Sequence, residues 1–257
     1  MNNTHSLLDS ELDVINALKQ LKWYGFANAI YNQIEQPEIF NKLTFVERIN
    51  IAINEHIDYL HLKKSQSLLK KSKLKGARTI DLIDANDERV LSHSTLAEIS
   101  TLGFIARKQN LIIRGASGTG KTELICALGK LACSRAISTE YITASDIMEL
   151  SAAKDIADRH KFRDRLKKIK LLIIDDLFLT DFSDTTYAKY LHDVIDDRMG
   201  STSTIFATQL TDAGIASGVK NIDVPVADAL VRRIKNCAFD IVLQPQQLIA
   251  HDGAKYA

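Results

Sequence analysis

The sequence predicts an α/β fold in which a parallel sheet flanked by helices follows a small all-helical domain. Beyond residue 80, apolar runs of high β-propensity alternate with helical patterns, as the strands and helices of a parallel sheet do. A glycine-rich loop joins the first of these runs to a helix. Residues 12–69 contain one glycine and one proline, with apolar residues at helical spacing, which indicates helices without strands.

Length and composition suit a small module followed by one larger core. The chain has 257 residues, of which 46% are apolar, which is more than one average domain needs and less than two full-sized domains need. After Gly76 the sequence passes into an acidic connector. We therefore place the boundary near residue 80, between a domain of residues 1–80 and a domain of residues 81–257.

Charge and cysteine usage narrow the class of protein. Lys and Arg number 33 against 32 Asp and Glu, so the whole-chain charge indicates neither a nucleic-acid nor a membrane partner. The basic excess lies at the front, where residues 1–80 hold 11 Lys and Arg against 8 Asp and Glu. The three cysteines form no C-x-x-C pair, which argues against a zinc site and suits a reducing cytosol. No apolar run reaches the ~18 residues of a membrane span, so we expect a cytoplasmic protein with no membrane partner.

The front domain should contain a long helix that begins near residue 44. Apolar residues recur at helical spacing at Val46, Ile49, Ile53, Ile57 and Leu60. Thr44 and Glu47 have the spacing of a capping box, in which each side chain satisfies a free backbone N–H of the other residue. Pro37 and Asn41 are expected in the turn before this helix.

Two stretches rich in basic residues each have two interpretations. The first contains no acid and comprises Lys63, Lys64, Lys70, Lys71, Lys73, Lys75 and Arg78. It is either a solvated helix face or a surface that binds the phosphates of DNA. The second spans residues 159–170, with Asp164 as its only acid among seven basic residues. Here a solvated helix is the favoured interpretation and a second DNA-facing surface the alternative.

One loop matches the phosphate-binding pattern G-x-x-x-x-G-K-[ST] in full. Its residues are Gly115, Ala116, Ser117, Gly118, Thr119, Gly120, Lys121 and Thr122. An apolar strand precedes the loop and a helical pattern follows it, which is the context that this motif requires. Backbone N–H groups should surround the phosphates of ATP. Lys121 should reach the β- and γ-phosphates, and the Thr122 hydroxyl should ligate Mg²⁺.

Two carboxylates follow another expected strand about fifty residues after this loop. The runs that we expect as strands are residues 111–113, 140–143, 171–174, 204–208 and 239–243. Asp175 and Asp176 directly follow the third of these runs. A buried strand that delivers acids at its carboxyl end suits Mg²⁺ bound to a nucleotide. We assign Asp175 to the metal and Asp176 to the attacking water, as the base.

Three more polar residues are candidates for contact with the γ-phosphate. Gln209 follows the expected strand at residues 204–208 and is the candidate for contact with the phosphate or the water. Thr208 is the second choice for this role. The alternative is that Gln209 is simply a polar loop residue without a function. Arg232 and Arg233 lie in an amphipathic turn. One of them would reach a neighbouring subunit and stabilise charge on the transferred phosphoryl group, unless both are simply solvated.

The residues together resemble the IstB-like ATP-binding proteins of insertion sequences, relatives of the DnaC helicase loaders within the AAA+ class. The resemblance runs from residues 18–21 and 43–48 through the phosphate-binding loop to residues 228–234, and the pair Asp175 and Asp176 is typical of this branch. It implies an AAA+ core and a homo-oligomer with ATP between subunits. It also implies a helical front domain for assembly and DNA contact, sequence-independent binding of double-stranded DNA, and a partner transposase.

Within this resemblance, Arg233 matches the inter-subunit arginine better than Arg232 does, and Gln209 stands where relatives often have an asparagine. The tail lacks the family's usual later arginine, and the 24 residues after Arg233 are too few for a full lid domain. The expected function is an ATP hydrolase that helps transposition by regulating a transposase and its target choice. The alternatives are a DnaC-like helicase loader and a nucleotide-binding regulatory module without turnover.

Overall fold

The computed structural model describes residues 10–83, 85, 91–153, 155–177, 185–210, 231–236 and 238–244. The chain divides into two compact units, residues 1–67 and residues 68–257. We call them the helical unit and the sheet unit. The helical unit holds α1 (Glu11–Gln20), α2 (Tyr24–Glu35), α3 (Pro37–Phe40) and most of α4 (Phe45–Lys71).

The long helix α4 begins at the predicted capping box. The backbone N–H of Thr44 donates to Glu47 Oε2 at 2.8 Å, and the N–H of Glu47 donates to Thr44 Oγ1 at 3.3 Å. The expected turn before it contains the one-turn helix α3, which Pro37 opens, because proline tolerates the first helical position. Helix α2 packs closely on α4, since a Cβ at Gly25 would lie only 2.7 Å from His56 Cα.

The segment that follows α4 belongs to the sheet unit. The backbone N–H of Tyr141 donates to the carbonyl of Ser72 at 2.7 Å. Leu74 fills the space left by the missing side chain of Gly129, and Lys130 Nζ donates to the carbonyl of Gly76 at 2.6 Å. These contacts place the division of the chain before this segment, whereas the sequence suggested a boundary near residue 80.

The sheet unit is built on five parallel strands in the order β2-β3-β4-β1-β5. They are β1 (Asn110–Arg114), β2 (Thr139–Thr143), β3 (Leu171–Asp175), β4 (Ser203–Thr208) and β5 (Ala238–Val242). Every residue of β1, β3 and β4 is buried, as in a parallel sheet covered on both faces. The predicted parallel sheet is thus confirmed, and each predicted strand overlaps an observed one.

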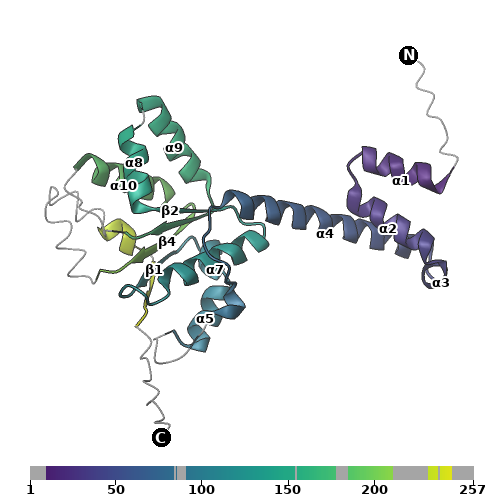
Figure 1. Ribbon diagram of the computed structural model, residues 1–257, viewed down its shortest axis with the longest axis horizontal. Coiled ribbons are helices and arrows are strands. Elements are labelled where there is room, and N and C mark those ends of the chain that lie inside the picture. The colour runs from purple at the N-terminus through teal and green to yellow at the C-terminus, as the bar shows by residue number, and fades with distance from the viewer. Residues whose placement is uncertain are drawn as a thin grey trace, which may run out of the picture. The chain divides into compact units, whose positions relative to one another are not determined.

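Helices cover both faces of this sheet (Figure 1). Helices α5 (His93–Ser100), α6 (Gly103–Ala106) and α7 (Lys121–Ser134) join one buried apolar cluster, and α8 (Ala144–Ala153), α9 (Ile156–Lys168) and α10 (Thr185–Arg198) join the other. A short 3-10 turn, Ile80–Leu82, precedes them. Leu102, with a left-handed φ of 59°, separates α5 from α6.

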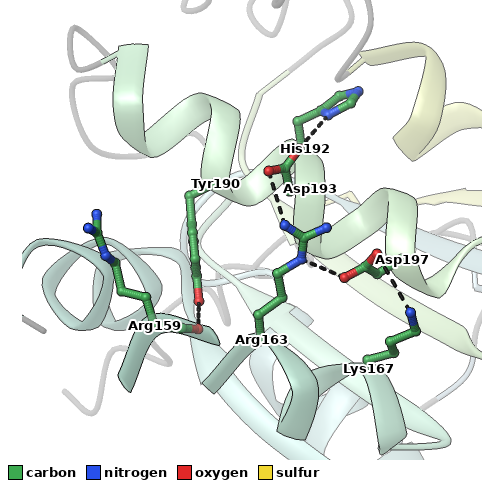
Figure 2. Close-up of polar contacts among 7 residues, drawn as sticks. All are labelled: Arg159, Arg163, Lys167, Tyr190, His192, Asp193 and Asp197. Carbon is green, nitrogen blue, oxygen red and sulfur yellow. Dashed lines mark hydrogen bonds and ion pairs between the residues drawn. The ribbon is translucent and has the colours of Figure 1, made fainter. Parts of the chain in front are cut away.

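Basic residues of α9 form ion pairs with carboxylates of α10, as Figure 2 shows. Arg163 contacts two carboxylates of α10, with its Nη1 3.2 Å from Asp193 and its Nε 2.5 Å from Asp197. The hydrogen bond from Arg163 lowers the pKa of the Asp197 carboxyl. Arg165 pairs at 3.1 Å with the buried Glu140 of β2. The second basic stretch is therefore not a uniformly solvated face, because two of its arginines join α9 to α10 and to β2.

None of the helices in the described part of the chain is both long and apolar enough to cross a membrane.

Candidate nucleotide-binding site

A cavity of about 360 Å³ lies where β1, β3 and β4 end. Its lining comes from the predicted phosphate-binding loop, the start of α7 and the residues that follow β3 and β4. The lining residues are Ser117, Gly118, Gly120, Lys121, Thr122, Glu123, Asp176 and Gln209. Ligands of open parallel sheets bind at this carboxyl end of the strands. The structure thus brings together side chains that the sequence placed in three separate segments.

The loop takes its shape from two glycine positions. Gly115 has φ of 155°, and a Cβ there would lie 2.5 Å from the carbonyl oxygen of Leu243, so a side chain would collide with the segment after β5. Gly120 adopts a left-handed φ of 83° directly before α7, a conformation that glycine accepts without strain. The loop therefore turns sharply into the helix N-terminus, where free N–H groups and the helix dipole favour an anion.

The Lys121 side chain folds back over the loop. Its ammonium donates to the carbonyls of Gly115 and Ala116, both at 2.7 Å, and the residue is only 6% exposed. Burial lowers the pKa of Lys121, while the nearby Asp175 and Asp176 oppose this shift. The ammonium group that we expect to bind the phosphates therefore lies at the loop, where backbone carbonyl oxygens hold it.

Asp175 lies beneath the loop and accepts three hydrogen bonds. The hydroxyls of Thr122 and Tyr141 both donate to Asp175 Oδ2 at 2.8 Å, and the backbone N–H of Asp176 donates to Oδ1 at 2.9 Å. Burial and the adjacent carboxylate raise the pKa of the Tyr141 phenol well above its usual value, so the phenol keeps its proton and remains a donor. The predicted pair of Thr122 and Asp175 is in direct contact.

Asp176 and Gln209 face the same cavity. Asp176 has a left-handed φ of 54°, which turns the chain directly after β3; aspartate tolerates this conformation better than most residues. Burial, followed by the charge of Asp175, raises the pKa of Asp176, so its carboxylate is more basic than that of a free aspartate. Thr208, in contrast, donates from Oγ1 to the carbonyl of Leu177 at 2.7 Å and holds the turn after β3.

The two arginine candidates differ in their surroundings. Arg233 is partly exposed and forms an ion pair with Asp196 of α10, with Nε and Oδ1 2.7 Å apart. Arg232 is exposed. Residues 228–230, which complete the predicted amphipathic turn, lie outside the described residues.

The first basic stretch separates into two groups. Lys63, Lys64, Lys70 and Lys71 are exposed on α4. The other members have partners within the sheet unit: Lys73 Nζ lies 3.6 Å from Glu140, Lys75 Nζ lies 4.9 Å from the centre of the Tyr141 ring, and Arg78 Nη1 lies 3.1 Å from Glu123. Acids from β2 and α7, remote in sequence, thus supply charges that the stretch itself lacks.

Tyr141 and Glu123 are residues of the site that no sequence motif indicated. Glu123 follows Thr122 in the first turn of α7 and lines the cavity. Tyr141 pairs in register with Ile173, two residues before Asp175. Residues two apart on a strand share a face, so the pairing of Tyr141 with Ile173 would have placed Tyr141 on the same face as Asp175. That inference requires knowing that β2 and β3 are neighbours, which the sequence alone does not show.

The chain resembles known proteins in sequence and in fold. The family described as IstB-like ATP binding protein matches residues 16–243. A candidate ATP-binding protein of insertion sequence IS1162 from Pseudomonas fluorescens is 31% identical over 79% of this chain and 88% of its own length.

Two solved structures share the fold. The crystal structure of DnaI has a TM-score of 0.52 at 18% identity and covers 69% of this chain and 93% of its own. AMPPCP-bound DnaA from Aquifex aeolicus has a TM-score of 0.53 at 19% identity and covers 66% of this chain and 51% of its own. These likenesses, with the parallel sheet and the loop before α7, show an AAA+-like P-loop fold. Since the family match extends from α1 to the end of β5, the chain belongs to the IstB-like ATP-binding proteins of insertion sequences.

Proposed function

We propose that this chain is an ATP hydrolase that assembles on double-stranded DNA with ATP bound between its subunits, and that it thereby regulates a partner transposase and its choice of target. One observation carries the enzymatic part of this proposal. Lys121, Thr122, Asp176 and Gln209 line one cavity, and Asp175 lies directly beneath it, hydrogen-bonded to Thr122.

The residues under the loop fit a magnesium ion. A hydroxyl and a carboxylate in contact at 2.8 Å, Thr122 and Asp175, are hard oxygen ligands of the kind that Mg²⁺ prefers. The described residues contain no group of three or more His, Cys, Asp or Glu side chains arranged to hold a metal. This suits Mg²⁺, which is commonly bound by one or two protein ligands together with phosphates and water. When bound, the ion neutralises charge on the β- and γ-phosphate oxygens.

In the proposed reaction each side chain has one task. Lys121 leaves the carbonyls of its own loop and holds the β- and γ-phosphates. Asp176 orients the attacking water and accepts its proton, a role helped by its raised pKa because a stronger base gains more from proton transfer. Gln209 contacts the γ-phosphate or the water from the end of β4.

Arg233 completes the site from a neighbouring subunit in this proposal. Its ion pair with Asp196 joins side chains that are 41% and 48% exposed, and exposed pairs of this kind contribute little stability. The guanidinium can therefore exchange Asp196 for a phosphate of the next subunit at low cost. Hydrolysis would then depend on assembly.

For DNA contact we propose the exposed lysines of α4 as the main group. Lys63, Lys64, Lys70 and Lys71 are exposed, whereas Lys73, Lys75 and Arg78 have partners within the sheet unit and would contribute less. Binding through phosphates is insensitive to base sequence and weakens steeply with salt. The link to a transposase rests on the family and on the insertion-sequence relative.

Phosphate release from the full chain, measured with and without duplex DNA, tests the enzymatic proposal. We expect Mg²⁺-dependent turnover that DNA stimulates. Asp176→Asn should retain ATP and remain assembled on DNA, because the water is no longer activated. Normal turnover in this variant would show that another group is the base, and absence of Mg²⁺-dependent ATP binding in the unaltered protein would refute the proposal.

A separate test addresses the transposase. The proposed partner transposase should be retained by the chain on DNA with a non-hydrolysable ATP analogue, and released with ADP. Electron microscopy of the same sample would show whether ATP lies between subunits. Equal retention with both nucleotides would contradict regulation through the nucleotide state.

A further inference from the structure

Tyr141 is a buried tyrosine whose hydroxyl points at the carboxylate of the nucleotide site. The residue lies in β2 and is 3% exposed. Its hydroxyl donates to Asp175 Oδ2 at 2.8 Å, the same oxygen that accepts the hydrogen bond of Thr122. None of the roles proposed above uses this side chain.

The strand register brings the phenol to Asp175. Tyr141 pairs with Ile173 on the parallel strand β3, and Thr143 pairs with Asp175. Because alternate residues of a strand share a face, Tyr141, Ile173 and Asp175 point to the same side of the sheet. Tyr141 and Ile173 belong to the buried cluster that also contains residues of α7, the helix that begins with Lys121 and Thr122. A diagonal neighbour at this spacing is within reach of a long aromatic side chain.

The phenol is itself held in place. The backbone N–H of Tyr141 donates to the carbonyl of Ser72 at 2.7 Å, so the strand is fixed on its outer side. The ammonium of Lys75 lies 4.9 Å from the ring centre, within the range of a cation–π contact. The ring has little freedom to turn its hydroxyl away from Asp175.

We propose that Tyr141 is a positioning residue for the magnesium-bound nucleotide, one that fixes the orientation of the Asp175 carboxylate. This inference rests on the proposed function, in which Thr122 and Asp175 hold Mg²⁺. Besides Thr122, whose hydroxyl oxygen would also ligate the metal, two donors hold Asp175: Tyr141 at Oδ2 and the backbone N–H of Asp176 at Oδ1. The terminal torsion of a carboxylate is otherwise soft. Partners that orient a metal ligand typically change metal affinity by about 10- to 100-fold when removed.

Tyr141→Phe tests this role because it removes the hydroxyl and keeps the ring. The binding of a fluorescent non-hydrolysable ATP analogue to the full chain would be measured across a Mg²⁺ titration and in EDTA. We expect the variant to need about tenfold more Mg²⁺ for half-maximal binding, with affinity in EDTA unchanged. A tyrosine that only fills the core would leave the Mg²⁺ midpoint where it is.

Tyr190→Phe is the matched control. Its hydroxyl donates to the carbonyl of Arg159 at 3.1 Å, in the contact between α9 and α10 that Figure 2 shows, on the opposite face of the sheet. This variant should have the Mg²⁺ midpoint of the unaltered protein. Thermal unfolding of both variants checks that they are folded.

The outcomes separate the two proposals. If the unaltered protein binds the analogue in a Mg²⁺-dependent manner and Tyr141→Phe has the same midpoint, the role of Tyr141 is refuted and the proposed function stands. If the unaltered protein shows no Mg²⁺ dependence, both are refuted. An equal shift in Tyr141→Phe and Tyr190→Phe would also refute the positioning role, since it would reflect general loosening of the sheet unit.

Discussion

The helical unit and the sheet unit bury their apolar side chains to very different extents. In the sheet unit, Leu171, Leu172, Ile173 and Ile174 are each 0% exposed. In the helical unit the large apolar residues are mostly at the surface, with Phe45 78% exposed, Leu21 67% and Trp23 49%. Among the described residues of the helical unit, the apolar ones that are fully buried are Ile15, Ala27, Ala29 and Ala52.

This difference indicates that the two units have different functions. A parallel sheet covered on both faces has a core of its own and can hold a nucleotide site rigidly. A few helices with small buried residues have too little core to be stabilised in the same way, and exposed apolar patches commonly mark interaction surfaces. The sheet unit should therefore carry nucleotide binding, while the helical unit and α4 should carry contacts with other molecules.

The largest expected effect concerns ATP hydrolysis. For this step we propose that the site of one sheet unit also needs Arg233 of a neighbouring subunit. Arg233→Ala should reduce phosphate release by about a thousandfold, because an arginine supplied to the γ-phosphate contributes about 10³–10⁵ to such reactions, and should leave ATP affinity nearly unchanged. Arg232→Ala is the matched control and should hydrolyse ATP normally. If Arg232→Ala lost hydrolysis and Arg233→Ala retained it, Arg232 would be the inter-subunit arginine.

Equal substitutions in the two units should differ in their effect on stability. Leu172→Ala removes a side chain that is 0% exposed and should cost about 3 kcal/mol of unfolding free energy, whereas Leu60 of α4 is 52% exposed and Leu60→Ala should cost less than about 0.5 kcal/mol. Denaturant unfolding of both variants measures the difference. Similar costs would mean that a partner surface buries Leu60 in the native protein.

Nucleotide binding should depend on the loop and be independent of exposed lysines elsewhere on the sheet unit. Lys121→Ala should weaken ATP binding by about a hundredfold, since the substitution removes a charge-assisted contact worth roughly 1.5–3 kcal/mol. Lys168→Ala, at an exposed position of α9, should bind ATP normally. Calorimetric titration measures the ATP affinity of both variants. An unchanged affinity in Lys121→Ala would show that the loop does not bind the phosphates.

The smallest expected effect concerns the surface of α4. The double substitution Lys70→Glu and Lys71→Glu should weaken binding to any duplex by about tenfold and reduce the slope of log affinity against log salt by about 0.9 for each DNA phosphate that is no longer neutralised. Lys73→Glu, whose partner is Glu140, serves as comparison and should change the slope less. An unchanged slope in the double variant would exclude this surface.

Much of the sheet unit follows from local patterns in the sequence. Runs such as residues 171–174 are apolar throughout because both faces of the strand are buried, and the loop at Gly115 to Thr122 carries its glycines where the backbone must turn. The capping box at Thr44 is equally local. These features need no knowledge of distant parts of the chain, and the structure confirms each of them.

Features that depend on distant segments were not predictable in this way. Arg198 is 2% exposed, yet a lone arginine at the end of a helical pattern predicts a solvated side chain. Its guanidinium donates to Thr204 Oγ1 at 3.0 Å and to the carbonyls of Ile169 at 2.9 Å and Ser203 at 2.7 Å. These acceptors come from two segments, the end of α9 and the start of β4, that the fold brings together at Arg198, just as it brings Tyr141 to Asp175.

The hydrogen bond from Tyr141 to Ser72 has a consequence for how the sheet avoids self-association. Strand β2 is at one end of the strand order, and an uncovered outer strand offers free N–H and C=O groups to any other chain, a common route to aggregation. The segment after α4 covers this border, with Lys73 and Lys75 beside it. A shortened chain that began after Gly76 would lose that cover and should precipitate, whereas one that began at Leu68 should stay dispersed.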